Sequence, residues 1–313
     1  MHVIFRESQG LEETETPTDL GQSPADLVVL SLSDSDLGAF TAGWHRARDA
    51  GSSLPDLRLA NIAALKHPLS VDTYVEQTLD GAKAILIRLI GGVPYWPYGL
   101  QRIEALAREK GLALAVLPGD GRADPRLDEI STLPVSTLRR LQHLCDAGGA
   151  VAAQAALAQL ALAAGLYAGP VKGAKLVPEA GLWTPGDGVI AAAPNLWTGA
   201  PDEAGEGGTA PRVLVVFYRS YLVAADLAPI EALFKSLQSQ GFAPLGLFAP
   251  SLKSPGTRDW LRDQVAALAP AMIVNATAFS GRGAEGVSPL DAAGVPVFQV
   301  ALATSTQDAW AEA

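Results

Sequence analysis

Residues 212–218 read Arg-Val-Leu-Val-Val-Phe-Tyr, a short run dominated by β-branched and aromatic side chains. Such a run is typical of a strand that is buried on both faces of a sheet. The next segment, 228–240, has the apolar spacing of a helix and ends at Gly241, a frequent helix stop. Residues 242–248 again have the pattern of a strand. This stretch therefore predicts a strand–helix–strand unit with parallel strands.

The same alternation continues toward the end of the chain. Ser254 is a suitable N-cap and Pro255 a suitable first residue for a helix over 254–268. The pattern then predicts, in order, a strand at 271–275, a short helix at 289–293 and a strand at 295–300. Alternating strands and helices indicate a parallel sheet with both faces covered.

The first part of the chain follows the same logic. Its apolar runs predict strands at 2–5, 26–32, 57–61, 84–90 and 112–117. Helical spacing predicts helices at 35–50, 71–79, 98–110 and 136–145, and an alanine-rich helix over 150–166. Glycine, proline and acidic residues at 198–210 cannot pack a core and mark a domain joint.

We therefore predict an α/β protein made of two tandem Rossmann-like or flavodoxin-like modules with parallel sheets. The first domain is expected at residues 1–200 and includes the alanine-rich helix. A linker is expected at 201–210 and the second α/β domain at 211–313. The two modules show no sequence repeat that can be aligned.

Composition narrows the range of partners. The 313 residues include 23 Lys and Arg against 33 Asp and Glu, a formal net charge of −10. An acidic chain repels nucleic acid and anionic membrane surfaces, so neither is an expected partner. The single cysteine, Cys145, excludes a disulfide framework and fits the reducing cytoplasm. No signal peptide is recognised, and Gln154 and Gln159 within the alanine-rich stretch favour a soluble helix over a membrane span.

The common catalytic motifs are missing from the sequence. No segment matches the P-loop, the G-x-S-x-G elbow or H-E-x-x-H, and the four histidines lie far apart. A G-x-G-x-x-G match at 281–286 follows the third predicted strand of its module, whereas a dinucleotide site needs it after the first. A flexible loop is the better interpretation. We identify no catalytic residue and no metal ligand.

Ligands of parallel α/β sheets bind outside the carboxyl ends of the strands. The strand at 84–90 is followed by Gly91 and Gly92, which allow close backbone approach. The string Tyr95-Trp96-Pro97-Tyr98 comes next, and its aromatic rings could stack on a flat ligand. The alternative is a turn with an aromatic lid over the core. Arg88 lies inside this apolar strand and needs a partner, either in an internal salt bridge or as an anchor for a ligand carboxylate.

The second module supplies three more candidates for substrate binding. Arg219 follows the strand at 212–218, and its planar fork suits a carboxylate; a bond to Asp226 is the alternative. Asn275 and Thr277 follow a later strand and would either orient a ligand or tie down the crossover loop.

Several strings in a fixed order resemble a known family. They are residues 20–31 (LGQSPADLVVLS), 57–61 (LRLAN), 67–72 (HPLSVD), 88–92 (RLIGG), 95–99 (YWPYG), 117–120 (LPGD), 217–219 (FYR), 275–279 (NATAF) and 289–291 (PLD). Together they resemble the N-terminal region of the aerobic cobaltochelatase large subunit family, CobN. The magnesium chelatase large subunit is a relative with a looser pattern. The resemblance spans residues 20–310, and its specificity lies in the order and spacing of the strings.

The resemblance implies a cytoplasmic metal chelatase of cobalamin biosynthesis, a ligase that inserts cobalt(II) into hydrogenobyrinic acid a,c-diamide. In this family the large subunit holds the macrocycle, and ATP is used by partner subunits that form a motor. Family members are several times longer, and their motif with histidine and glutamate lies further along. This segment alone is therefore expected to be non-catalytic and to bind no cofactor.

The partners implied are the remainder of the large subunit, the ATPase motor subunits and the corrin precursor. The alternative is a free-standing tetrapyrrole-binding or partner-docking module without chelatase activity.

Overall fold

A computed structural model describes residues 16–169, 171, 173, 176–197, 210–279, 281–282 and 286–302. The chain forms two compact units. Unit 1 comprises Met1–Leu176 and Val223–Ala225, and unit 2 comprises Val177–Leu222 and Asp226–Ala313. The expected strand at 2–5 and nearly all of the expected linker lie outside the described residues.

The chain enters unit 2 earlier than the expected domain boundary at residue 200. Strand β5 (Gly181–Thr184) pairs with β8 (Ala243–Ala249) of the second sheet, so this segment belongs to unit 2. The sequence of 168–200 is rich in proline and glycine and contains no long apolar run that would have revealed this pairing.

Unit 1 is built on a four-stranded parallel sheet, sheet A. Its strands are β1 (Leu27–Ser31), β2 (Leu57–Asn61), β3 (Ala84–Leu89) and β4 (Ala113–Pro118), arranged in the order β2-β1-β3-β4. All neighbouring pairs run parallel. The prediction of a parallel α/β module is confirmed, and each of these strands lies where the apolar runs indicated.

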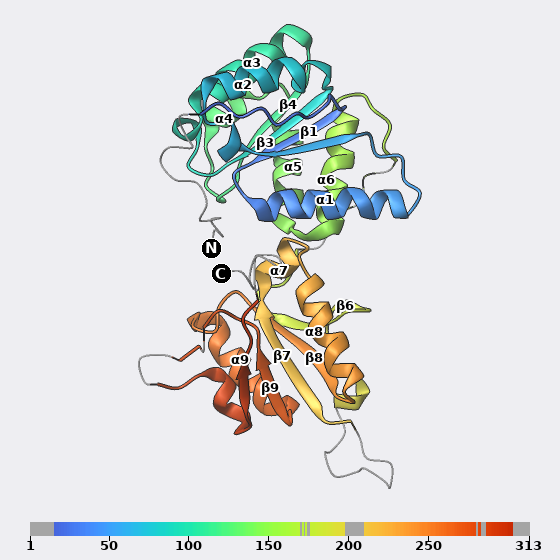
Figure 1. Cartoon of the computed structure of the whole chain (residues 1–313), viewed down its shortest axis with the longest axis vertical. Coiled ribbons are helices and arrows are strands. Elements are labelled where there is room, and N and C mark those ends of the chain that lie inside the picture. Colours follow the sequence, from blue (N-terminus) through green and yellow to red (C-terminus); the bar gives the residue numbers. More distant parts are fainter. Residues whose placement is uncertain are drawn as a thin grey trace. The chain divides into compact units, whose positions relative to one another are not determined.

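Helices cover both faces of sheet A (Figure 1). One face packs against α1 (Asp34–Asp49), α5 (Val135–Ala147) and α6 (Gly149–Ala163). The opposite face packs against α2 (Pro68–Gln77) and α3 (Pro97–Lys110). Because side chains alternate along a strand, Leu27 and Val29 of β1 enter the first core whereas Val28 and Leu30 enter the second. Shorter elements that the sequence did not predict complete the unit: η2 (Ile62–Leu65), η3 (Leu79–Gly81), η4 (Val93–Tyr95) and α4 (Pro125–Ile130).

The alanine-rich helix α6 is a core element of unit 1. It lies against α1 at Gly43, where an added Cβ would come within 2.6 Å of the backbone nitrogen of Gln154. Small residues on both helices therefore permit this close approach. Within the described part of the chain, no helix combines the length and apolar character that crossing a membrane requires.

Unit 2 is built on a six-stranded sheet, sheet B. Its parallel strands are β7 (Arg212–Tyr218), β8, β9 (Met272–Asn275) and β10 (Val297–Gln299). The full order is β10-β9-β7-β8-β5-β6, in which β5 and β6 (Gly188–Ile190) form an antiparallel hairpin that the sequence did not predict. The four parallel strands repeat the order of sheet A, with β7 and β8 in the places of β1 and β2.

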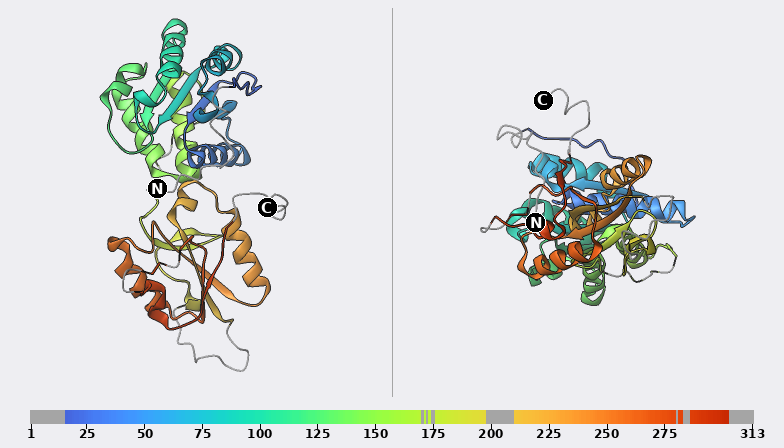
Figure 2. Two further views of the ribbon diagram at one scale, coloured as in Figure 1. Left: turned by 60° about the vertical axis from the view of Figure 1, so that its left-hand side comes forward. Right: turned by 90° about the horizontal axis from the view of Figure 1, so that it is seen from below.

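The helices of unit 2 are α8 (Ala228–Ser239), α9 (Pro255–Leu268) and α7 (Arg219–Val223) except for its last residue. Its short turns are η5 (Asn195–Trp197) and η6 (Pro289–Ala293). Figure 2 shows α8 and α9 on opposite sides of sheet B. Trp183 of β5 makes edge-to-face contacts with Phe217 and Phe234, with ring centroids 5.6 and 5.2 Å apart. These rings fix the hairpin to the α8 face of the sheet.

Candidate functional site

The switch point of sheet A lies between β1 and β3. From β1 the chain moves to β2 on one side, and then crosses to β3 on the other. Ligands of doubly wound sheets bind outside the carboxyl ends of the strands at such a point. Arg88 of β3 is paired in register with Ser31, the last residue of β1, and so lies at this place.

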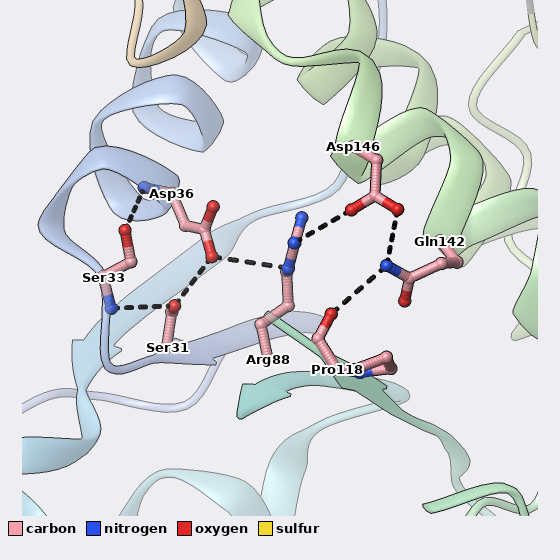
Figure 3. Close-up of polar contacts among 7 residues, drawn as sticks. All are labelled: Ser31, Ser33, Asp36, Arg88, Pro118, Gln142 and Asp146. Atoms are coloured by element: carbon pink, nitrogen blue, oxygen red, sulfur yellow. Dashed lines mark hydrogen bonds and ion pairs between the residues drawn. The ribbon is translucent and has the colours of Figure 1, made fainter. Parts of the chain in front are cut away.

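The guanidinium of Arg88 is held by two carboxylates of unit 1 (Figure 3). Its Nε lies 3.4 Å from Oδ2 of Asp36, in the first turn of α1. Its Nη2 lies 3.2 Å from Oδ1 of Asp146, near the end of α5. Arg88 is only 4% exposed, so these two carboxylates must compensate its buried positive charge. Of the two expected alternatives, the structure contains the internal salt bridge.

Neighbouring side chains hold both carboxylates in place. The hydroxyl of Ser31 donates to Oδ2 of Asp36 at 2.9 Å, and the backbone N–H of Asp36 donates to Oγ of Ser33 at 3.3 Å. On the other side, Nε2 of Gln142 donates to Oδ2 of Asp146 at 2.7 Å. The arrangement therefore ties the strand ends to α1 and α5, as Figure 3 shows.

Cys145 lies beside this ion pair and lines the same cavity of about 20 Å³ with Asp36 and Arg88. Burial lowers the pKa of Arg88, but Cys145, Asp36 and Asp146 raise it, and the net shift is upward. Burial raises the pKa of the Cys145 thiol to about 11, although Arg88 acts in the opposite direction. At neutral pH the thiol is protonated, so the two carboxylates compensate the arginine. The cavity has room for about one water molecule and not for an organic ligand.

The glycine loop after β3 is followed by two aromatic side chains, one exposed and one buried. Gly91 and Gly92 adopt φ angles of +87° and +73°, which favour glycine. Tyr95 lies against Gly91, where an added Cβ would come within 2.6 Å of its ring, yet Tyr95 is 64% exposed. Trp96 is the lid over the core: it is 4% exposed, and its Nε1 donates to the carbonyl of Leu65 at 2.8 Å. The structure thus contains the aromatic lid, formed by Trp96, while Tyr95 faces solvent and its stacking on a ligand stays a prediction.

Arg219 has partners that the sequence did not indicate. Its Nε donates to the carbonyl of Pro178 at 2.8 Å and its Nη2 to the carbonyl of Val177 at 2.7 Å. The expected alternative of a bond to Asp226 is wrong, since the structure directs the guanidinium to these two carbonyls. Burial lowers the pKa of Arg219, and Glu179 acts in the opposite direction. The bonds fasten the start of unit 2 to the end of β7.

Asn275 and Thr277 tie down the loop after β9. Asn275 is fully buried, and its Nδ2 donates to the carbonyl of Phe279 at 3.1 Å and to Oε1 of Gln299 at 2.9 Å. Its Oδ1 accepts from the N–H and the hydroxyl of Thr277, at 3.1 and 2.7 Å. Both donors and both acceptor positions of the amide are therefore in use. The structure contains the loop-tying arrangement, and a role in ligand binding stays a prediction.

The candidates fall into one group in each unit. Arg88, Gly91, Gly92 and Tyr95 share the carboxyl end of β3, and the other three candidates lie at strand ends of sheet B. Asp146 and Gln142 were missed, because no sequence signal links α5 to β3. Over the described ranges, no three His, Cys, Asp or Glu side chains gather in a way that could hold a metal ion.

Residues 144–313 match the family described as CobN/Magnesium Chelatase. Two curated relatives are aerobic cobaltochelatase CobN subunits. The protein from Sinorhizobium sp. is 36% identical over 99% of this chain and 24% of its own length. The protein from Pseudomonas aeruginosa is 34% identical over 99% of this chain and 24% of its own length. The chain thus spans about a quarter of the length of these relatives.

A solved structure has the same fold. The catalytic subunit of cobaltochelatase from Mycobacterium tuberculosis superposes with a TM-score of 0.68 over 91% of this chain and 22% of its own chain. The two sequences are 22% identical there, so this likeness bears on the fold alone.

Proposed function

We propose that this chain, which belongs to the CobN/magnesium chelatase family, is the N-terminal part of an ATP-dependent cobaltochelatase large subunit. The observation that carries the proposal is the 34–36% identity to CobN subunits over 99% of this chain. The complete enzyme takes cobalt(II) as a substrate and inserts it into hydrogenobyrinic acid a,c-diamide in the cytoplasm. Separate motor subunits hydrolyse the ATP.

Within this enzyme, the segment acts as a scaffold and contacts the macrocycle. Metal insertion requires removal of water from the metal and of protons from ring nitrogens, so it needs converging donor and basic groups. We assign those groups to the remainder of the large subunit. The ion pair of Arg88 and the amide network of Asn275 hold strand ends rigidly. Rigid strand ends suit a scaffold that presents a loop to a large ligand.

The loop at residues 91–95 is the part of unit 1 that we assign to the macrocycle. The Tyr95 ring and the Asp124 carboxylate pack directly over its two glycines, so the surface left for a flat ligand is the ring of Tyr95, which is 64% exposed and can stack. In contrast, Arg88 and Arg219 already bond to groups of the protein. We therefore place ligand contact on the loop and structural roles on the two arginines.

Titration of the purified chain with hydrogenobyrinic acid a,c-diamide, followed by absorbance and tryptophan fluorescence, tests this proposal. We expect saturable binding that Tyr95→Ala weakens roughly fivefold, the equivalent of about 1 kcal/mol of lost stacking. Tyr167→Ala is the matched control, because Tyr167 is also exposed, at 81%, but follows α6.

A second readout separates the two candidate functions. The chain is combined with the remainder of the large subunit and the motor subunits, and ATP-dependent cobalt insertion is measured with and without it. Insertion that needs the chain supports the proposal. Macrocycle binding without any effect on insertion would favour a free-standing tetrapyrrole-binding module, and neither binding nor an effect on insertion would contradict both.

A further inference from the structure

A cationic hollow lies in unit 2, and none of the candidate residues described above lines it. It has a volume of about 510 Å³ and is formed by the start of α9 and the residues that lead into η6. Its polar lining consists of Lys253, Arg258, Arg262, Asp259 and Ser288. The volume falls within the range of small-molecule sites in proteins, about 300–1,000 Å³.

The charges of this hollow are opposite to those of the chain as a whole. Three cationic side chains line it against one carboxylate, although the protein carries a net charge of −10. Arg262 is compensated, because its Nη1 lies 3.0 Å from Oδ1 of Asp259 and its Nη2 lies 3.3 Å from Oδ1 of Asp263. The other two cations of the hollow, Arg258 and Lys253, differ from Arg262 in this respect.

Arg258 and Lys253 have no carboxylate partner within the ranges that the structure describes. Nη2 of Arg258 donates to the carbonyl of Val287 at 3.3 Å, which orients the guanidinium without neutralising it. The backbone of Lys253 is fixed by a bond from its N–H to Oγ of Ser251 at 3.1 Å, while its side chain is exposed. Arg258 is thus held at the hollow with Lys253 exposed beside it, and no carboxylate of the described residues pairs with either charge.

The location also suits a ligand. The hollow lies where β8 ends and α9 begins, at the carboxyl end of the parallel strands, and this is the edge at which α/β sheets bind ligands. The first turn of α9 adds partial positive charge on the same side. Ser288 is only 5% exposed and receives the N–H of Leu290 on its Oγ at 3.3 Å, so its hydroxyl is held at the wall of the hollow.

We propose that this hollow binds an oxyanion, either a carboxylate or a phosphate group of a small molecule, through Arg258 and Lys253. Arginine recognises both groups with its planar fork, and lysine supplies a second charge. This inference goes beyond the proposed function and does not depend on it, because it rests only on the charges and the shape of unit 2.

The test is a calorimetric titration of the purified chain at constant ionic strength with three probes: inorganic phosphate, pyrophosphate and citrate. We expect saturable binding of at least one probe, with affinity that falls as salt is raised. Binding of citrate alone identifies a carboxylate site, and binding of phosphate or pyrophosphate alone identifies a phosphate site. Absence of saturable binding by all three would overturn the proposal.

Variants locate the bound anion. Arg258→Gln and Lys253→Gln should each weaken binding about tenfold, and Arg258→Lys should recover part of the loss. Lys235→Gln is the matched control, since Lys235 is an exposed lysine on α8 of the same unit. Thermal unfolding of each variant verifies that it is folded. Equal affinities for Lys253→Gln, Lys235→Gln and the unchanged chain would place the anion elsewhere and refute the assignment.

Discussion

Strands β3 and β9 occupy the same place in two sheets with the same parallel order, but their carboxyl ends are held in different ways. In unit 1 the buried side chain at this place is the charged Arg88, bound to two carboxylates. In unit 2 it is the neutral Asn275, whose amide bonds to Thr277, to Gln299 and to the loop backbone. One topology thus accommodates either an ion pair or an amide network at its switch point.

The two solutions differ in what they connect. Arg88 joins β3 to α1 and α5, which lie far apart in the sequence. The amide of Asn275 bonds mainly within the loop that follows it, and Gln299 of the edge strand β10 completes the network. The ion pair therefore connects three elements of unit 1, but loss of any one of its charged side chains leaves the charges of the others less compensated. The amide network of Asn275 holds one loop, and none of its hydrogen-bonding groups carries a formal charge. Stability measured separately in each unit tests this difference.

The largest effect is expected for Arg88→Ala. Removing one partner of a buried ion pair costs about 3–5 kcal/mol. We expect about 3 kcal/mol, at the lower end, because the side chains of Asp36 and Asp146 are 22% and 41% exposed and water can solvate them. Hydrogen–deuterium exchange measured by mass spectrometry should show faster exchange in β1 and β3, with β7 and β9 unchanged.

A surface ion pair of the same unit serves as the control. Arg139 pairs with Asp128, but its side chain is 55% exposed, so Arg139→Ala should cost less than about 1 kcal/mol. If Arg88→Ala costs no more than this control, the ion pair at the switch point does not organise unit 1.

The second effect concerns Cys145, the single cysteine and therefore a reporter of unit 1 alone. Burial raises the pKa of its thiol to about 11, so little thiolate is present near pH 8. Because the thiolate is the reactive form, alkylation at pH 8 should be on the order of 100-fold slower than in the unfolded chain, where a cysteine has a pKa near 8.5.

The reactivity of Cys145 should increase with pH, because deprotonation produces the reactive thiolate. The rate of alkylation of the folded chain should rise about tenfold per pH unit between pH 8 and 10 and level off near pH 11. Intact-mass measurement after iodoacetamide treatment follows the reaction. A folded chain that reacts within tenfold of the unfolded chain at pH 8 would show that the surroundings of Arg88 are open to solvent.

The parallel strands of both units could be predicted from the sequence. The antiparallel hairpin of unit 2 and the ion-pair partners of Arg88 could not. Apolar runs such as 84–90 are set by burial on both faces and are visible in the residues themselves. The hairpin β5–β6 was missed because its strands have only four and three residues in a segment rich in glycine and proline. Burial likewise required a partner for Arg88, but its identity depends on how α5 packs, and Asp146 is 58 residues away.

The partners of Arg219 could not be predicted for a different reason. Asp226 was an eligible partner close in sequence, yet the guanidinium bonds to the carbonyls of Val177 and Pro178. Every residue has a carbonyl, so no side-chain pattern can reveal such a bond. The two alternatives for Asn275, ligand contact or loop tying, were both visible because an amide next to a strand end has few other uses.

The smallest effect is expected for Asn275→Ala, and it tests the neutral half of the comparison. The change removes an amide with 0% exposure and leaves the Thr277 and Gln299 side chains without that partner. Each lost bond costs about 1 kcal/mol, and buried groups left unsatisfied cost more, but the loop can relax toward solvent because Phe279 is 56% exposed. We therefore expect about 2 kcal/mol, seen as faster exchange in β9 and β10 with β3 unchanged. The loss should be the same at 0.05 and 0.5 M salt, because no formal charge is removed. A salt-dependent loss for Asn275→Ala would mean that charge, rather than the amide network, holds the end of β9.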